Sequence, residues 1–560
     1  MIVGIDLGTT NSLAGIFRNG KVELVPNVFG DFLTPSVVGL DDDGELIVGK
    51  LAKERLVTKP DQTVAQFKRF MGTKHPIQLG DRTYQAEELS SFVIRKLIED
   101  TERYTGEKVE EIIVSVPAYF NDAQRYATKL AGQFAGVHIE RIINEPSAAS
   151  LAQKIGNNME DQAFIVVDFG GGTLDISVVE SFDNVVEILA IAGDNRLGGE
   201  DFTAVIAQEF LTVNGFKKDF ISNEFYYKVL VESEKAKLQL NSQDEVQLSV
   251  ADKDTQYEMT LSYKRFYEIS QPLLARVKAV LDRALFDANH SHVDAEDFVL
   301  VGGTSKLRLV QEFLSFCIGQ AVSTTDDPDL MIAKGCALVA GIKERQGEVR
   351  DLLLSDICPF SLGVEIVGDK YSPIIERNSS LPSSRVERYY AHSLGQTQLR
   401  FNIYQGERMR ASENLLLGSL VVNVPENYRD YEAADVRFTY DLNGILDVEV
   451  TVLSTGQVSN KIILQDSINL SEEEIAKKKA ELEKYKINVQ ETEVYRYLIE
   501  RADRLYIMML GEERENLMER TRFFEKEVAK ASLPHLPKLY DEFSLYLDRL
   551  ERGDRSHYER

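Results

Sequence analysis

Two loops in this chain combine aspartate, glycine and threonine in a similar order. One is Asp6-Leu7-Gly8-Thr9-Thr10, and the other is Asp168-Phe169-Gly170-Gly171-Gly172-Thr173. Glycine lets backbone N–H groups approach a polyphosphate closely, threonine hydroxyls add donors, and a leading aspartate can order a magnesium ion through retained waters. One such loop alone is equally well a plain turn. Because each loop lies between two apolar strands, we expect the pair to clamp a phosphate from both sides.

Two more glycine pairs follow apolar strands. They are Gly198-Gly199-Glu200-Asp201 and Gly302-Gly303-Thr304-Ser305-Lys306. A single Gly-Gly is usually a tight turn. Several glycine elements at strand ends within one region nevertheless favour a nucleotide cleft.

Residues 1 to about 346 supply the elements that would position these loops. Short apolar strands such as Ile112–Val116, Phe164–Val167 and Phe298–Val301 alternate with helical stretches. Continuous β-branched runs between helices predict an α/β sheet that is buried on both faces.

The pattern changes after about residue 357. Apolar and polar residues alternate from Leu399 to Tyr404, from Val436 to Tyr440 and from Leu446 to Val452, and Asn443-Gly444 separates the last two runs. This pattern predicts a hairpin in an antiparallel sheet with one face exposed to water.

The C-terminal region has a helical pattern. Ser471 and Glu474 form a capping box, and charged amphipathic segments follow it to the end of the chain. Pro534 and Pro537 are expected to break this region before a last helix. Leu498, Leu505, Met508 and Met509 are the predicted packed stripe.

A short stretch from Val349 to Asp356 joins the α/β and β regions. Leu352, Leu353 and Leu354 are consecutive leucines between charged residues. This stretch is either an ordinary strand or a linker that docks in one state and is released in another.

The composition narrows the classes of protein. A chain of 560 residues is expected to form two to four domains. Its net charge of −26 disfavours nucleic acid and anionic membrane as partners. Three cysteines without a Cys-x-x-Cys spacing predict neither a disulfide framework nor a zinc site. We see no signal peptide and no apolar run of about 18 residues, so we expect a cytoplasmic location.

The chain resembles the DnaK-type heat-shock chaperone family nearly from end to end. The resemblance implies a multidomain fold with an actin-like α/β nucleotide-binding domain at 1–346, an interdomain linker at 347–356, a β-sandwich peptide-binding domain at 357–468 and an α-helical lid at 469–560. The short lid most resembles the specialised bacterial HscC branch. The motifs that carry the resemblance are Gly4-Ile5-Asp6-Leu7-Gly8-Thr9-Thr10-Asn11-Ser12, Val116-Pro117-Ala118-Tyr119-Phe120-Asn121-Asp122, Ile142-Ile143-Asn144-Glu145-Pro146, Asp168 to Thr173, Gly198 to Asp201 and Gln405-Gly406-Glu407-Arg408.

The resemblance implies an ATP-dependent chaperone that couples ATP hydrolysis to the binding and release of extended hydrophobic segments of unfolded proteins. Lys68 matches the lysine that orients the attacking water, and Glu145 matches a carboxylate that bonds metal-bound water. Without the resemblance, Lys68 would be interpreted as a solvated surface charge. Phosphoryl transfer to water needs mainly positioning and charge neutralisation. The implied catalytic residues are Lys68, Glu145, Asp168 and Thr173, and the implied magnesium group, acting through waters, is Asp6, Glu145 and Asp168.

The family's adenosine-binding positions show departures in this chain. Leu238 and Asn241 stand where the family often has arginine and serine, and Lys306 stands where it has arginine. Lysine cannot stack on adenine as a flat guanidinium does, so we expect looser ATP binding, faster spontaneous exchange and no need for an exchange factor. The residues implied to bind ATP or ADP are Asp6, Gly8, Thr9, Thr10, Asn11, Gly170, Gly171, Gly172, Gly198, Gly199, Glu200, Glu234, Lys237, Asn241, Gly302, Gly303, Lys306 and Asp329.

The resemblance also places a peptide groove in the β region. Val367 and His392 stand where the family commonly has methionine and alanine over the peptide, which implies an altered client preference. The alternative for each apolar groove residue is the β-sandwich core, and the alternative for His392 is a surface residue. The implied groove residues are Val364, Val367, Tyr389, His392, Leu399 and Phe401.

Coupling between the regions is a further implication. ATP is expected to favour a docked linker, an open lid and fast peptide exchange, and ADP the converse, because a ligand shifts only states that it binds differently. Pro117 and Arg125 match a relay beside Lys68 and Glu145, and Leu352, Leu353 and Leu354 match the linker. The positions that match a J-domain co-chaperone surface are Tyr119, Asn121, Asp122, Arg141 and Asp356.

Three rival interpretations stay open at this point. A sugar kinase or a filament-forming actin relative would explain the phosphate loops but not the β region and the helical tail. A nucleotide-regulated exchange factor that binds no clients is the third. Peptide-stimulated ATP hydrolysis would separate that factor from a chaperone.

Overall fold

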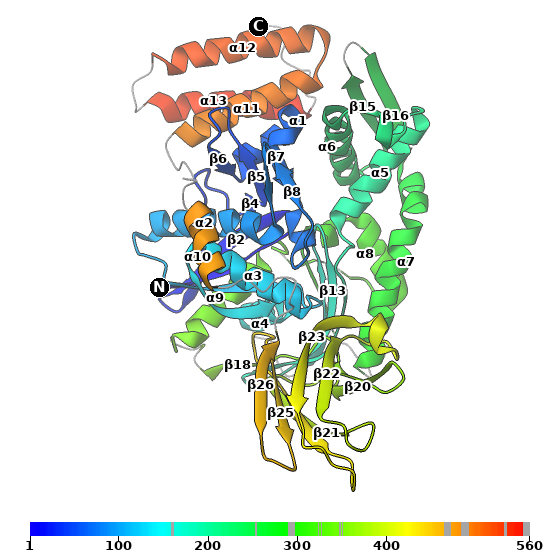
Figure 1. Ribbon diagram of the computed structural model, residues 1–560. Coiled ribbons are helices and arrows are strands. Elements are labelled where there is room, and N and C mark those ends of the chain that lie inside the picture. Colours follow the sequence, from blue (N-terminus) through cyan, green and yellow to red (C-terminus); the bar gives the residue numbers. More distant parts are fainter. Residues whose placement is uncertain are drawn as a thin grey trace.

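The computed structural model describes residues 1–157, 162–252, 255–288, 297–322, 324–325, 327–346, 349, 351–463, 472–482, 492–530 and 535–552. In these ranges the chain forms two α/β lobes, a pair of antiparallel sheets below them and a group of helices above them (Figure 1). The order of α/β, β and α regions predicted from the sequence is confirmed.

The first lobe is built on a mixed sheet with the strand order β11-β10-β1-β2-β3, and β4 pairs with β2. Helices α2 and α3 pack on one face of this sheet and α4 and α9 on the other, so that Ile112, Ile113 and Val114 are fully buried, as predicted. The elements are β1 (Ile2–Asp6), β2 (Asn11–Arg18), β3 (Lys21–Leu24), β4 (Thr34–Pro35), β10 (Glu111–Val116), β11 (His138–Asn144), α2 (Ala86–Thr105), α3 (Asp122–Ala135), α4 (Glu145–Asn157) and α9 (Met331–Lys343).

The second lobe repeats this plan around the strand order β17-β12-β13-β14-β18. Its hairpin β12–β13 corresponds to the hairpin β1–β2 of the first lobe, and each hairpin carries one of the two predicted phosphate loops. The elements are β12 (Gln162–Phe169), β13 (Leu174–Phe182), β14 (Val185–Asp194), β17 (Asp297–Val301), β18 (Leu353–Ser355), α5 (Gly199–Val213), α7 (Tyr263–Asp287) and α8 (Arg308–Ile318).

Smaller units extend each lobe upward (Figure 1), and residues of both units line one cavity. On the first lobe they are β5 (Val37–Leu40), β6 (Leu46–Val48), α1 (Lys50–Thr58), β7 (Thr63–Ala65), the short helix η2 (Phe67–Phe70), β8 (Ile77–Leu79) and β9 (Arg82–Tyr84). On the second lobe they are α6 (Asn223–Gln239), β15 (Glu245–Asp252) and β16 (Thr255–Ser262).

The β region forms two four-stranded sheets, β20-β19-β22-β23 and β21-β24-β25-β26, around one apolar core. The hairpin predicted at Asn443-Gly444 is confirmed between β24 and β25, and Gly444 adopts the positive φ of 71° that such a turn favours. The strands are β19 (Leu362–Ile366), β20 (Lys370–Ile375), β21 (Ser383–Tyr390), β22 (Gln398–Gln405), β23 (Leu415–Asn423), β24 (Ala433–Tyr440), β25 (Leu446–Val452) and β26 (Val458–Ile463).

The C-terminal region forms the helices α10 (Glu472–Leu482), α11 (Thr492–Met508), α12 (Gly511–Val528) and α13 (Leu536–Arg552). Leu498 and Leu505 lie in the apolar core of this region and Met509 at its edge, whereas Met508 is half-buried outside that core. Pro537 lies in the first turn of α13 instead of ahead of it, because the first turn of a helix tolerates proline. Ser471 and Pro534 lie outside the described residues.

Among the helices that the structure describes, none is both long and apolar enough to cross a membrane.

Candidate functional site

The two predicted phosphate loops face each other across the base of the cleft. A Cβ atom added to Gly171 would lie 1.8 Å from Thr10 Oγ1, and one added to Gly172 would lie 2.7 Å from Thr9 Cγ2. Only glycine permits such a close approach at these two positions. The Thr10 hydroxyl is buried and has no hydrogen-bond partner among the described residues. A phosphate oxygen is a suitable acceptor for such a hydroxyl.

Buried carboxylates gather beside the loops. Asp6, at the end of β1, accepts a hydrogen bond from Ser115 Oγ at 3.0 Å, and its pKa is raised to about 7, chiefly by burial and next by Glu145. Burial, followed by Glu145 and Asp175, raises the pKa of Asp168 well above its ordinary range. Burial and Glu145 likewise raise the pKa of Asp175 to about 8.

This carboxylate group fits a divalent cation. Asp168 Oδ2 is buried and has no partner among the described residues, and close carboxylates repel one another when ionised. A bound magnesium ion would compensate that charge, and it usually retains several waters between itself and the protein. Sequence reasoning predicted Asp6, Asp168 and Glu145 for this role but missed Asp175. The one sequence feature that could have indicated Asp175 is its position two residues after Thr173.

Lys68 and Glu145 form a buried ion pair. Lys68 Nζ donates to Glu145 Oε1 at 2.8 Å, and both side chains are less than a tenth exposed. Lys68 comes from η2, at the base of the upper part of the first lobe, and Glu145 begins α4. The structure thus brings together two residues that lie 77 positions apart in the chain.

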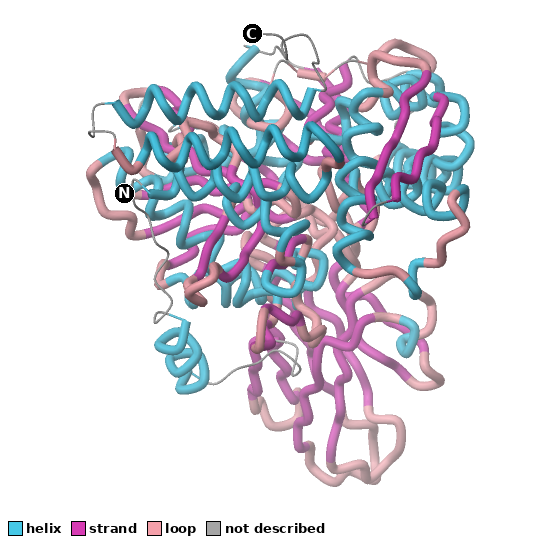
Figure 2. Tube along the Cα trace, turned by 90° about the horizontal axis from the view of Figure 1, so that it is seen from above, coloured by secondary structure: helices cyan, strands magenta, loops and turns pink. Residues whose placement is uncertain are grey.

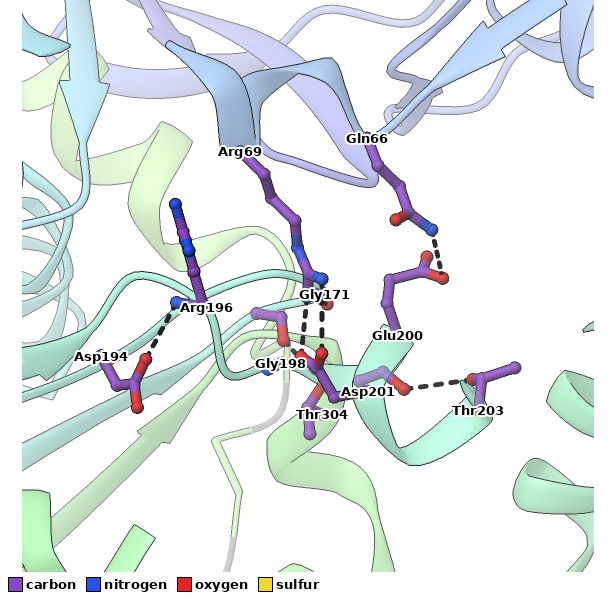
Figure 3. A network of polar contacts seen from close by, with 12 residues as sticks. Gln66, Arg69, Gly171, Asp194, Arg196, Gly198, Glu200, Asp201, Thr203 and Thr304 are labelled. Carbon is purple, nitrogen blue, oxygen red and sulfur yellow. Dashed lines mark hydrogen bonds and ion pairs between the residues drawn. The ribbon is translucent and has the colours of Figure 1, made fainter. Parts of the chain in front are cut away.

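A polar network joins the two lobes next to the phosphate loops (Figure 3). The Arg69 guanidinium donates to Asp201 Oδ2 at 2.7 Å and to the carbonyl of Gly171 at 3.4 Å. Gln66 donates to Glu200 Oε2 at 2.7 Å. Asp201 also accepts from the Gly198 N–H at 2.8 Å, at the start of α5. Sequence reasoning missed Gln66 and Arg69, although Arg69 directly follows the predicted catalytic lysine.

Of the residues predicted for adenosine, Glu234 and Lys306 line the cavity in the cleft, whereas Lys237 does not. Lys237 is buried, donates to the Gly199 carbonyl at 2.9 Å and to Thr203 Oγ1 at 3.0 Å, and pairs with Glu234. It therefore holds the start of α5 in place. Lys306 pairs with Asp329.

A cavity of about 2170 Å³ occupies this cleft. Predicted nucleotide-binding residues in its lining are Thr9, Thr10, Asn11, Glu200, Glu234, Lys306 and Asp329.

Several predicted nucleotide residues shape the backbone around the cavity. Gly8 donates its N–H to Ser12, and Gly170 donates to the carbonyl of Thr173. Gly302, with φ of 80°, packs against the backbone of Phe169, and Gly303 lies beside Asp329. Asn241 is not brought into the cavity lining: its side-chain oxygen accepts from the Arg308 N–H and caps α8.

The predicted peptide groove is divided between core and surface. Val364, Leu399 and Phe401 lie in the core between the two β-sheets, which was the alternative left open for them. Tyr389 is half-buried against Phe401, with ring centroids 6.0 Å apart. Val367 and His392 are exposed, and Val367 is 65% exposed. The assignment of all six residues to a groove stays a prediction.

The β region is docked against the nucleotide-binding lobes. Asp122 Oδ1 accepts from Tyr440 Oη at 2.8 Å and from Gln405 Nε2 at 3.0 Å. The side chain of Asn443, in the predicted hairpin, accepts from the Ile142 N–H at 3.1 Å. Arg125, at the same interface, donates to Asn144 Oδ1 at 2.6 Å.

The stretch between the regions is docked as a strand. Leu353, Leu354 and Ser355 form β18, which pairs in parallel with β14, and Leu352 is buried beneath it. Asp356 is buried and accepts from Asn144 Nδ2 at 2.8 Å and Ser147 Oγ at 3.1 Å. Leu353–Ser355 within this stretch is therefore a strand in this arrangement, and this does not conflict with the interpretation of the stretch as a linker that docks in one state.

The residues predicted for a J-domain surface are unevenly accessible. Asp122 and Asp356 are buried in this arrangement, and burial lowers the pKa of Arg141. Asn121 caps α3, and Tyr119 packs against Phe360 with ring centroids 4.3 Å apart. The carboxylates of Asp122 and Asp356 are therefore not exposed on the surface of the docked arrangement.

Comparison with known proteins identifies relatives of the whole chain. A family profile described as "Hsp70 protein" matches residues 2–544. The chain is 36% identical, over 500 residues, to "Chaperone protein DnaK" of Thermosipho melanesiensis, an alignment that covers 86% of this chain and 83% of that protein.

Proposed function

Because the chain belongs to the Hsp70 family, we propose that it is an ATP-dependent chaperone that binds and releases extended segments of unfolded proteins. One observation supports the proposal most directly. The lobes that carry the paired loops are joined to the docked β-sandwich through buried polar contacts. Neither the reaction of a sugar kinase nor the assembly of an actin-like filament requires the β-sandwich or its buried contact with Asp122.

The chemistry proposed for the cleft is ATP hydrolysis. Lys68 would orient the attacking water, Thr173 and the loop amides would hold phosphate oxygens, and Lys68 itself is held by Glu145. Asp6, Glu145 and Asp168 would hold magnesium through waters, and the ion would supply charge neutralisation at the phosphates. The side-chain arrangement is consistent with each of these roles.

The docked arrangement is proposed to be the ATP-bound state. In it the linker strand β18 pairs with β14, and the helices above the lobes are distant from the β region (Figure 1). A peptide on the β-sandwich would then be uncovered and would exchange quickly. ADP would release β18 and allow the helices to cover the peptide. ATP can drive this change only by binding the docked state more tightly.

Peptide dissociation is the measurement that tests this function. A fluorescent, extended hydrophobic peptide should leave the intact chain about 5- to 150-fold faster with ATP than with ADP, since a coupling free energy is typically about 1–3 kcal/mol. Fluorescence anisotropy after a chase with unlabelled peptide gives both rates. Equal rates with the two nucleotides would contradict the coupling, and no peptide binding at all would favour a client-free exchange factor.

We also propose that the chain belongs to the specialised HscC branch, acts in the cytoplasm and works with a J-domain co-chaperone. The basis for the branch is the set of departures at Leu238, Asn241 and Lys306. Lys306 offers a point charge instead of a planar guanidinium beside the base.

Release of ADP tests the proposed independence from an exchange factor. We expect a fluorescent ADP analogue to leave the purified chain without any added protein, and a Lys306→Arg variant to release it about two- to fivefold more slowly, the range expected for a stacked guanidinium. Stopped-flow fluorescence measures both rates. Slow release from the unaltered chain would contradict this part of the proposal.

A further inference from the structure

The helices α11, α12 and α13 form a compact unit, called here the lid bundle (residues 492–530 and 535–552). They pack around an apolar core that includes Leu498, Leu505, Phe524 and Phe543. The lid bundle lies over the upper end of the first lobe, where α11 contacts α1 (Figure 1). Viewed from above, its long helices run side by side across the top of the molecule (Figure 2).

The lid bundle forms the outer wall of the nucleotide cavity. Its lining includes Thr9 and Thr10 of the first phosphate loop, Glu54 on α1, Lys235 on α6, and residues of α11 and α13 such as Tyr540. Its volume of about 2170 Å³ is larger than the roughly 300–1,000 Å³ of a typical small-molecule site. The space beyond the predicted nucleotide position therefore continues to the lid bundle.

Buried ion pairs hold the lid bundle on the first lobe. Arg504 on α11 donates both to Glu54 on α1 and to Glu551 on α13. Lys96 Nζ on α2 lies 3.0 Å from Glu493 of α11, and both of these side chains are less than a tenth exposed. Loss of one partner leaves the other charge buried and unpaired, so such pairs strongly bias docking.

The lid bundle also extends toward the second lobe. A second cavity, of about 1040 Å³, lies between α6 and the turn from α11 to α12, with Val231 on one side and Met508 on the other. The pKa of Glu232 on α6 is raised by burial, and Lys235 and Arg504 oppose that rise. Arg504 is thus bonded to the first lobe and lies within electrostatic reach of the second.

We propose that the docked lid bundle closes the outer end of the nucleotide cavity, and that Arg504 holds it over the cleft, so that bound ATP is retained until the bundle leaves. This inference rests on the proposed function, in which ATP is bound in the docked arrangement. The lid bundle would then slow nucleotide release when it is docked on the lobes, and slow peptide release when it has left them.

The two nucleotides should consequently differ in how they leave. ATP would be released slowly because the lid bundle covers the cleft, whereas ADP would leave through an uncovered cleft. Hydrolysis would therefore open the exit for its own product, and ATP would be the nucleotide retained after exchange. Replacement of ADP by ATP would then proceed without an exchange factor.

Nucleotide release from variants of the full chain tests the gate. Arg504→Ala removes the bond to Glu54, and we expect it to speed release of a fluorescent ATP analogue by about tenfold or more, as for other truncated buried charge pairs. Release of the matching ADP analogue should change by less than about twofold, within the scatter of surface substitutions. A stopped-flow chase with excess unlabelled nucleotide gives each rate.

A second variant tests whether the effect of Arg504→Ala comes from a change in the structure of the lid bundle itself. Glu54→Gln leaves the sequence of the lid bundle and its Arg504–Glu551 pair unchanged, and it should speed ATP release in the same direction. Arg265→Ala is the matched control, because Arg265 Nε pairs with Glu209 at 2.9 Å on the surface of the second lobe. It should leave both rates unchanged.

Two results would overturn the gate: ATP release that neither variant changes, or ADP release that rises as much as ATP release. Failure of the proposed function would look different, because peptide dissociation from the unaltered chain would then not depend on the nucleotide.

Discussion

Replacing Lys68 by methionine is expected to slow ATP hydrolysis by about 10²- to 10³-fold, the loss typical of one group that stabilises a transition state electrostatically. The same change should destabilise the nucleotide-binding lobes by about 3–5 kcal/mol, because it leaves the carboxylate of Glu145 buried without its partner. Single-turnover hydrolysis of ATP and urea unfolding give the two quantities.

A paired variant separates catalysis from folding. Lys68→Met combined with Glu145→Gln removes both charges, and methionine and glutamine keep volumes close to those of the original side chains. The double change leaves no buried charge without its partner, so the free energy of unfolding should return part of the way toward that of the unaltered chain. Hydrolysis should stay slow. A paired variant that regained hydrolysis would show that Lys68 and Glu145 serve the fold and not the reaction.

The fold was predictable where one local pattern had a single physical solution. The apolar runs at 112–116, 164–167 and 298–301 had to be buried on both faces, and Asn443-Gly444 between alternating runs had to be a hairpin. That the two predicted phosphate loops face each other was predictable, because the second carries Gly171 and Gly172 where Thr10 and Thr9 of the first come closest. In each case the signal lies within about ten residues of chain.

The contacts between distant segments were not predictable in this way. Arg69 meets Asp201, 132 residues away, and nothing near either residue indicates the pair. Asp175 is buried, and it accepts a hydrogen bond from the Tyr119 N–H, 56 residues away. The period of a β-strand also cannot separate a peptide groove from a core, since both sets of side chains point to the same face, and Val364, Leu399 and Phe401 illustrate that ambiguity.

The interface between the lobes and the β-sandwich has a small polar centre. Asp122 is buried there, and burial raises its pKa to about 6 even though Tyr440 donates to its carboxylate. A buried carboxylate is tolerated only while donors surround it. The donors from Tyr440 and Gln405 belong to the β-sandwich, so Asp122 Oδ1 has these two partners only in the docked state. Asp122 therefore contributes to docking of the β-sandwich even when no partner protein is present.

Asp122→Ala is accordingly expected to uncouple the peptide site from the nucleotide. Truncating Asp122 leaves Tyr440 Oη and Gln405 Nε2 without their acceptor in the docked state, and a neutral buried donor left unpaired commonly costs about 1–3 kcal/mol. Peptide dissociation with ATP should therefore slow by about tenfold or more, toward the rate with ADP. The rate with ADP should not change, because the interface is proposed to be open in that state.

The control and the assay conditions distinguish docking from co-chaperone binding. Asp282→Ala removes an equivalent carboxylate from the surface of the second lobe, where Asp282 pairs with Lys278, and it should leave both peptide rates unchanged. The measurement uses fluorescence anisotropy with purified chain and no J-domain protein. If ATP still accelerated peptide release from Asp122→Ala to the original extent, Asp122 would not be a docking contact, and its predicted place on a co-chaperone surface would be the better explanation. A loss of acceleration in the absence of any partner protein arises within the chain, because among the described residues the Asp122 carboxylate accepts hydrogen bonds only from the β-sandwich.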